Sequence, residues 1–80
     1  MKSCFIVVHR NYADGLMAYA FFDEKDARAD VEEDIAETVD ALLGQGYEPT
    51  TLRHGEDDVE VYVADSDIYY EWSVISSSIR

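Results

Sequence analysis

The sequence predicts a single α+β domain over residues 1–80, in which a mainly antiparallel sheet of four to five strands packs on one amphipathic helix. Two observations support this class. Apolar residues recur every three or four positions in one central segment, and every second position in the segments on both sides of it. Polar turns separate these segments, with no linker, internal repeat or low-complexity stretch. The expected order is strand, strand, helix, strand, strand, strand.

The first two segments are expected to form a pair of strands joined by a turn. Residues 3–9 are rich in β-branched and aromatic side chains, and a polar turn at 11–15 follows them. In this turn Asp14-Gly15 provides a residue that tolerates a positive φ angle. The second strand covers 16–22. Both of its faces are apolar, which favours a central position in the sheet or a covered second face.

The central segment predicts one helix from Glu24 to Leu43. Asp23 is a good N-cap residue, and Gly44 stands where a left-handed C-terminal cap is wanted. Apolar side chains at helical spacing fall on one arc and are expected to pack on the sheet. These are Ala27, Val31, Ile35, Val39 and Leu42.

Three further strands are predicted after the helix, separated by polar turns. Pro49 marks an edge or entry position, and a short strand covers 50–53. Residues 59–64 alternate as a half-buried strand, and 68–75 form the last strand.

The predicted core combines one face of the sheet with the apolar arc of the helix. It contains Phe5, Val7, Val31, Ile35, Val39, Leu42, Val61, Val63, Tyr70 and Trp72. One helix covers only one face of such a sheet, so the other face is left open to water, a ligand or a partner. The side chains expected on this open face include Tyr62, Tyr69, Glu60 and Glu71.

The charge balance excludes some classes of partner. Six Lys plus Arg stand against eighteen Asp plus Glu, which gives a formal net charge of −12. Direct binding to nucleic acid or to an anionic membrane is not expected, because both depend on cationic side chains. No segment is apolar over the roughly eighteen residues that a bilayer-spanning helix needs. The single cysteine forms no intramolecular disulfide. We therefore expect a soluble cytoplasmic protein.

No residue pattern in the chain indicates a particular reaction, and we expect neither enzymatic activity nor a cofactor. Cys4 lies about 16 Å from His9 along the same strand, at about 3.3 Å per residue, so the two cannot act together. Cys4 is interpreted as a small buried side chain and His9 as a strand-end residue. Asp65 and Asp67 have a spacing found in loops that bind hard metals. Since Asp is common in turns for backbone reasons, no metal is expected there.

The negative charge of the predicted helix is organised. At about 100° per residue, five carboxylates project between about 180° and 260° from Val31, opposite the apolar arc. We call this set the acidic ridge, and it comprises Asp26, Asp30, Glu33, Glu37 and Asp40. Lys25 and Arg28 project away from it. Like charges four residues apart destabilise a helix by roughly 0.2–0.5 kcal/mol per pair, a cost that interspersed lysines would remove.

The linear density of the acidic ridge approaches that of a nucleic acid. The ridge spans about 21 Å, or one carboxylate per roughly 5 Å, compared with about 3.4 Å between the charges of one DNA strand. In size, acidity and clustering of carboxylates, the chain resembles small nucleic-acid-mimicking inhibitors of the anti-CRISPR and anti-restriction type. The resemblance is one of composition over the whole chain, without a shared motif, so no residue role is transferred. It implies a protein that blocks a basic, nucleic-acid-binding surface of a partner by occupying it.

The predicted partner-binding residues are the acidic ridge together with Glu56, Asp57, Asp58, Tyr62 and Tyr69. The first three of these extend the negative field if their turn lies near the helix. An alternative is a small protein-interaction module or homodimer that uses the aromatic open sheet face, with the acidity serving solubility. Two further interpretations are a merely solvated acidic helix face and general surface acidity of the halophilic kind.

Overall fold

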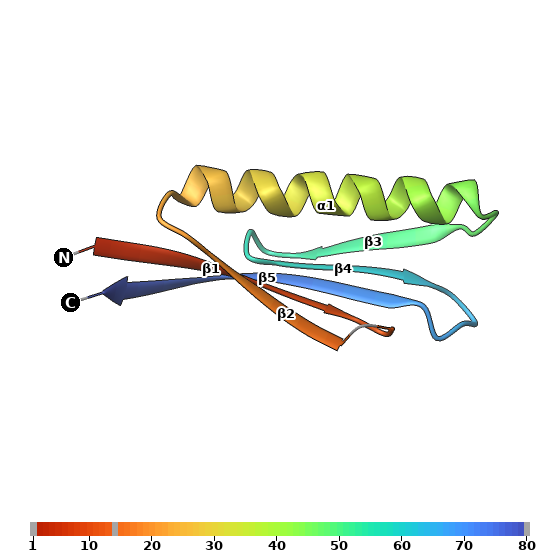
Figure 1. Ribbon diagram of the computed structural model, residues 1–80. Coiled ribbons are helices and arrows are strands. Elements are labelled where there is room, and N and C mark those ends of the chain that lie inside the picture. The colour runs from red at the N-terminus through yellow and green to blue at the C-terminus, as the bar shows by residue number, and fades with distance from the viewer. Residues whose placement is uncertain (1, 14, 80) are drawn as a thin grey trace.

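The computed structural model describes residues 2–13 and 15–79, and it confirms the α+β class and the predicted order of elements. Five antiparallel strands form one sheet, and one helix lies over one face of it (Figure 1). The elements are β1 (Lys2–Asn11), β2 (Gly15–Phe21), α1 (Glu24–Gly44), β3 (Pro49–His54), β4 (Asp58–Val63) and β5 (Tyr69–Ile79). The turn between β1 and β2 contains Asp14, which lies outside the described residues, while Gly15 has the expected positive φ of 84°.

The strands lie in the order β2-β1-β5-β4-β3. The first and last strands of the chain are neighbours at the centre of the sheet, and they pair from Lys2 with Ile79 to Asn11 with Tyr70. The two ends of the chain therefore lie side by side (Figure 1). This pairing also extends β1 and β5 beyond their predicted ends, because each provides the other with a continuous hydrogen-bonding partner.

β2 is an edge strand and most of its residues are exposed, so neither placement expected from its two apolar faces, a central position or a covered second face, is found. It pairs with β1 alone among the described strands, and residues 15–20 are exposed. Leu16 is 61% exposed and Tyr19 is 46% exposed. Phe21, at the end of the strand, packs against the core. The opposite edge is β3, which begins at Pro49 as predicted.

Both ends of α1 are capped, the start by a side chain and the end by backbone hydrogen bonds. At the start, the Asp23 side chain accepts a hydrogen bond from the N–H of Lys25 at 2.8 Å. At the end, the left-handed cap lies two residues beyond the predicted Gly44. The helix continues to Gly44, and the positive φ of 90° falls on Gly46. Gly46 and Tyr47 donate their N–H groups to carbonyl oxygens in the last turn, both at 3.0 Å, which is a Schellman motif.

The core lies between α1 and the sheet. Six of the predicted core residues are buried: Val7, Val31, Ile35, Leu42, Val61 and Trp72. The other four are partly buried against them: Phe5, Val39, Val63 and Tyr70. Ala27, Val59, Ile68 and Val74 complete the buried cluster. Cys4 is buried, as the sequence predicted.

An aromatic stack forms the centre of the core. His9 is not a strand-end residue as predicted but lies buried inside β1, where its ring stacks on Trp72 with ring centroids 4.8 Å apart. Its Nδ1–H donates to the backbone carbonyl oxygen of Glu71 at 3.1 Å. On the helix side, the Nε1–H of Trp72 donates to a carboxylate oxygen of Asp34 at 2.8 Å. The one polar group of this buried indole is thereby satisfied, and the bond ties β5 to α1.

Candidate functional site

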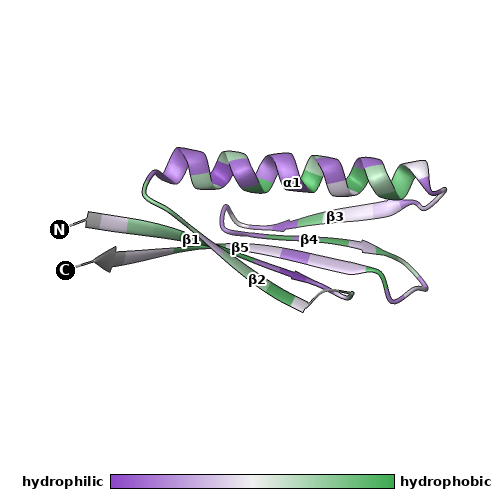
Figure 2. Ribbon diagram, viewed as in Figure 1, coloured by the Kyte–Doolittle hydropathy of each residue, from purple (hydrophilic) through white to green (hydrophobic). Residues whose placement is uncertain are grey.

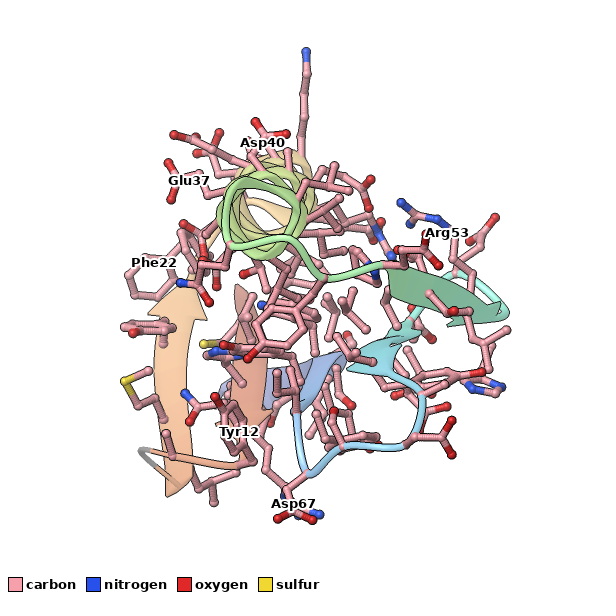
Figure 3. The ribbon with its side chains drawn as sticks, turned by 90° about the vertical axis from the view of Figure 1, so that its right-hand side faces the viewer. Tyr12, Phe22, Glu37, Asp40, Arg53 and Asp67 are labelled. Carbon is pink, nitrogen blue, oxygen red and sulfur yellow. The ribbon has the colours of Figure 1, made fainter. Side chains whose placement is uncertain are left out.

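The five carboxylates of the acidic ridge share one exposed flank of α1. Hydrophilic residues dominate the first half of this helix, and hydrophobic ones become more frequent toward its end (Figure 2). Viewed along the helix, Asp40 points away from the sheet and Glu37 points to the side on which β2 lies (Figure 3). Among the described residues, none of the five acids forms an ion pair. The ridge therefore presents uncompensated negative charge to solvent.

The arginines near α1 are engaged on its other flank. The guanidinium of Arg28 donates to Asp57 at 2.8 Å, and that of Arg53 donates twice to Glu32, at 2.7 and 2.8 Å. The hydrogen bonds from Arg53 lower the pKa of the Glu32 carboxyl below its ordinary value. In the view along the helix, Arg53 lies on the side of α1 opposite to Glu37 (Figure 3). One flank of α1 is thus ion-paired and the other is not.

We expect Glu37→Lys to stabilise the fold. The substitution removes the repulsion between Glu37 and Glu33 and creates a favourable Glu-to-Lys pair four residues apart, together worth about 0.4–1 kcal/mol. For a domain of this size, the melting temperature should rise by roughly 2–8 °C at low ionic strength. Thermal unfolding followed by circular dichroism measures this change. Glu37→Gln is the control and should give about half the effect. A melting temperature that falls in both variants would contradict an unpaired ridge.

Of the predicted site residues in the β3-β4 hairpin, Glu56 and Asp57 lie near the helix but on its ion-paired flank, whereas Asp58 is paired with Ser73 of β5. Arg28 donates to the backbone carbonyl of Glu56 at 2.7 Å as well as to the Asp57 carboxylate. Asp58 begins β4 and accepts a hydrogen bond from the Ser73 hydroxyl at 2.7 Å. A groove of about 560 Å³ separates this hairpin from α1, and both arginines that line it are paired. These three acids therefore do not continue the acidic ridge.

Tyr62 and Tyr69 lie on the open face of the sheet, where they are cross-strand neighbours. The Tyr69 hydroxyl lies 2.5 Å from a carboxylate oxygen of Glu60 and 2.9 Å from one of Glu71, and the His54 ring also bonds Glu60. Burial raises the pKa of Tyr69, and its bond to Glu60 adds to this rise. Hydrogen bonds from Tyr69, and then from His54, lower the pKa of Glu60. This polar cluster lies on the open face of the sheet, and it is separate from the acidic ridge and from the groove between the hairpin and α1.

We expect Tyr69→Phe to raise the pKa of Glu60, because it removes the largest cause of that pKa lying below its usual 4.5. A group with a lowered pKa in the folded state stabilises the protein above its unfolded pKa, and this contribution is lost as the pH falls through the folded pKa. The stability difference between the wild type and Tyr69→Phe should therefore shrink under acidic conditions. Carbon-13 NMR titration of Glu60 in the two proteins measures the shift. An unchanged Glu60 pKa would rule out the role given to the phenol.

The acidic ridge also borders a groove that the sequence did not predict. This groove has a volume of about 320 Å³ and lies between α1 and the edge strand β2. Its lining comprises Tyr19, Phe21, Asp30, Glu33, Asp34 and Glu37. The prediction missed this groove because it did not place β2 at the sheet edge beside α1. No sequence signal within β2 indicates the groove, because it depends on the position of β2 at the sheet edge.

The fold and the ridge define a small acidic α+β domain that exposes a polyanionic helix. Within the described residues, no three His, Cys, Asp or Glu side chains come together in a way that could hold a metal ion. No helix in this part of the chain combines the length and apolar character that crossing a membrane requires. Comparison of the chain with protein-family models, curated proteins and solved structures finds no match.

Proposed function

We propose that this protein is a non-catalytic inhibitor that occupies a basic, nucleic-acid-binding surface of a partner protein as a mimic of DNA or RNA, in the manner of an anti-CRISPR protein acting on a bacterial defence complex. One observation carries the proposal: the ridge carboxylates are exposed and unpaired, while the arginines near α1 neutralise other acids. A surface that served solubility alone would not need this separation.

The rigid support of the ridge favours such binding. The helix is fixed to the sheet by buried Val31, Ile35 and Leu42, and by the hydrogen bond from Trp72 to Asp34. The backbone that carries the carboxylates is therefore held in place before any partner arrives, which reduces the entropy lost on binding. A groove lined by Lys and Arg would meet carboxylates at a spacing near that of phosphates. Complementary fields of this kind accelerate association and select the partner.

The proposal is tested by affinity capture from a phage-infected bacterial lysate, in parallel at low and high salt. The proteins retained at about 50 mM salt should be nucleic-acid-binding proteins, and most should be released at about 500 mM, because the contacts are charge pairs that salt screens. Mass spectrometry identifies the retained proteins. A set of partners that lacks basic proteins and is unaffected by salt would contradict the proposal.

A second candidate function uses the open sheet face for protein interaction or homodimer formation. It is favoured by exposed apolar side chains on that face, since Leu16, Leu52 and Ile75 are 61%, 42% and 49% exposed. Loss of partner binding in Tyr69→Ala, with variants of the acidic ridge unaffected, would support this alternative. Sedimentation equilibrium of the wild type tests the homodimer directly. A concentration-independent monomer mass would exclude it.

A further inference from the structure

We propose that the free edge of β2 is the docking site for an extended, basic segment of the partner, which joins the sheet as an additional strand beside the acidic ridge. This inference rests on the proposed function, because the ridge provides the charge that selects the segment. It specifies the class of ligand, which is an extended segment of the partner with alternating basic and apolar residues.

The edge of β2 is suited to strand addition. The strand pairs with β1 in an unbroken register from Gly15 to Phe21, without a bulge, and no described strand covers its outer side. Alternate N–H and C=O groups therefore point outward. Proteins usually protect such edges with proline, charged side chains or bulges. The other edge strand has these features, since β3 begins with Pro49 and carries Arg53 and His54, whereas β2 contains neither proline nor a charged residue.

The two faces beside this edge differ in chemistry. On the helix side, Tyr19 and Phe21 line the groove together with ridge acids that include Glu33 and Glu37. The side chains of an added strand that point to this side would lie beside the Tyr19 ring and face these carboxylates, so Lys or Arg fits there. On the open side, β2 presents Leu16, Ala18 and Ala20, which are uncharged and exposed. The segment that fits both sides alternates basic with apolar residues.

Repulsion between like charges disfavours a second copy of this chain as the occupant of the β2 edge. If two β2 strands paired antiparallel about a twofold axis perpendicular to the sheet, both helices would lie on the same face. Their acidic ridges would then face each other across the junction, and each chain already carries a net charge of −12. Like charges brought together in this way oppose association. A basic segment of another protein removes this repulsion.

Two synthetic peptides test the proposal with the intact protein. One is an eight-residue peptide in which Lys and Val alternate, and the other has the same composition arranged as four Lys followed by four Val. The alternating peptide should bind about tenfold more tightly, and it should slow hydrogen exchange at alternate backbone amides of residues 15–21, because these donate to the added strand. Equal affinity of the two peptides, with unchanged exchange in β2, would overturn strand addition and leave ridge binding intact. Binding of neither peptide would count against both proposals.

A matched pair of variants tests whether the peptide binds at the β2 edge. Tyr19→Lys puts a positive charge into the groove, where it competes with the peptide for the ridge, and should weaken binding of the alternating peptide about tenfold. Thr51→Lys makes the same change of charge at an exposed position on the opposite edge strand. Its effect should be no more than about twofold. Equal weakening by both variants would show that net charge alone governs binding and would overturn the proposed location.

Discussion

Trp72→Ala should leave the protein unfolded or close to unfolding at 25 °C. Trp72 is fully buried at the centre of the sheet, stacks on His9 and Tyr70, and donates to Asp34 on the helix. Truncating a buried aromatic side chain to alanine costs about 3–5 kcal/mol, and the loss of the hydrogen bond leaves Asp34 without this partner. A domain of this length has a total stability of only about 4–12 kcal/mol. One substitution therefore removes a large part of the free energy of unfolding.

Urea denaturation followed by far-UV circular dichroism measures this effect, because the protein has no second tryptophan to report by fluorescence. Trp72→Phe is the informative comparison, since it retains an aromatic ring and removes the Nε1–H donor. It should cost about 1–3 kcal/mol. Tyr47→Ala, at a residue that is 40% exposed, should change stability by less than about 0.5 kcal/mol. Equal midpoints for Trp72→Ala and Tyr47→Ala would contradict the position of Trp72 in the core.

The double variant Glu33→Lys with Glu37→Lys should lose most of its affinity for a basic partner. The two substitutions lie next to each other on the acidic ridge and replace two attractive contacts with repulsive ones. We expect affinity to fall by a factor of about ten or more near 0.1 M salt, with the fold intact. Surface plasmon resonance on a partner captured from the lysate measures the change. Circular dichroism confirms that both side chains, which are exposed in the wild type, tolerate the substitution.

The control is Glu48→Lys with Asp67→Lys, which changes the net charge by the same amount. Both residues are exposed and lie outside the helix, and Asp67 lies on the far side of the molecule from α1 (Figure 3). This control should weaken binding much less, because its charges do not touch the partner and are screened by salt beyond about 10 Å. If both double variants weaken binding equally, only the net charge matters and the ridge has no special role.

The helix was the element best predicted from the sequence. Its apolar arc at Val31, Ile35 and Leu42 and its N-cap at Asp23 are local signals, and each of them is found in the structure. The C-terminal cap was displaced to Gly46, because a second glycine two residues later provides the left-handed conformation equally well. Angular spacing along the helix was likewise sufficient to place the acids of the ridge on one flank.

The position of β2 could not be predicted, because strand order is decided by pairing between distant segments. The pairing of β1 with β5 joins residues 2–11 to 70–79, and no local feature of β2 reports it. A strand that is apolar on both faces fits a buried central position and an exposed edge position equally well. The pairing of Arg53 with Glu32 also depends on how β3 lies beside the helix. The sequence therefore placed the ridge acids on one flank but left open whether they were free of arginine partners.

The most direct test of nucleic-acid mimicry is a competition experiment on a captured partner. Fluorescence anisotropy follows a labelled DNA or RNA oligonucleotide bound to that partner while this protein is added. If the two ligands share one basic surface, the oligonucleotide should be fully displaced, and its apparent Kd should rise linearly with the concentration of added protein. A ternary complex in which the oligonucleotide keeps its affinity would contradict the central claim.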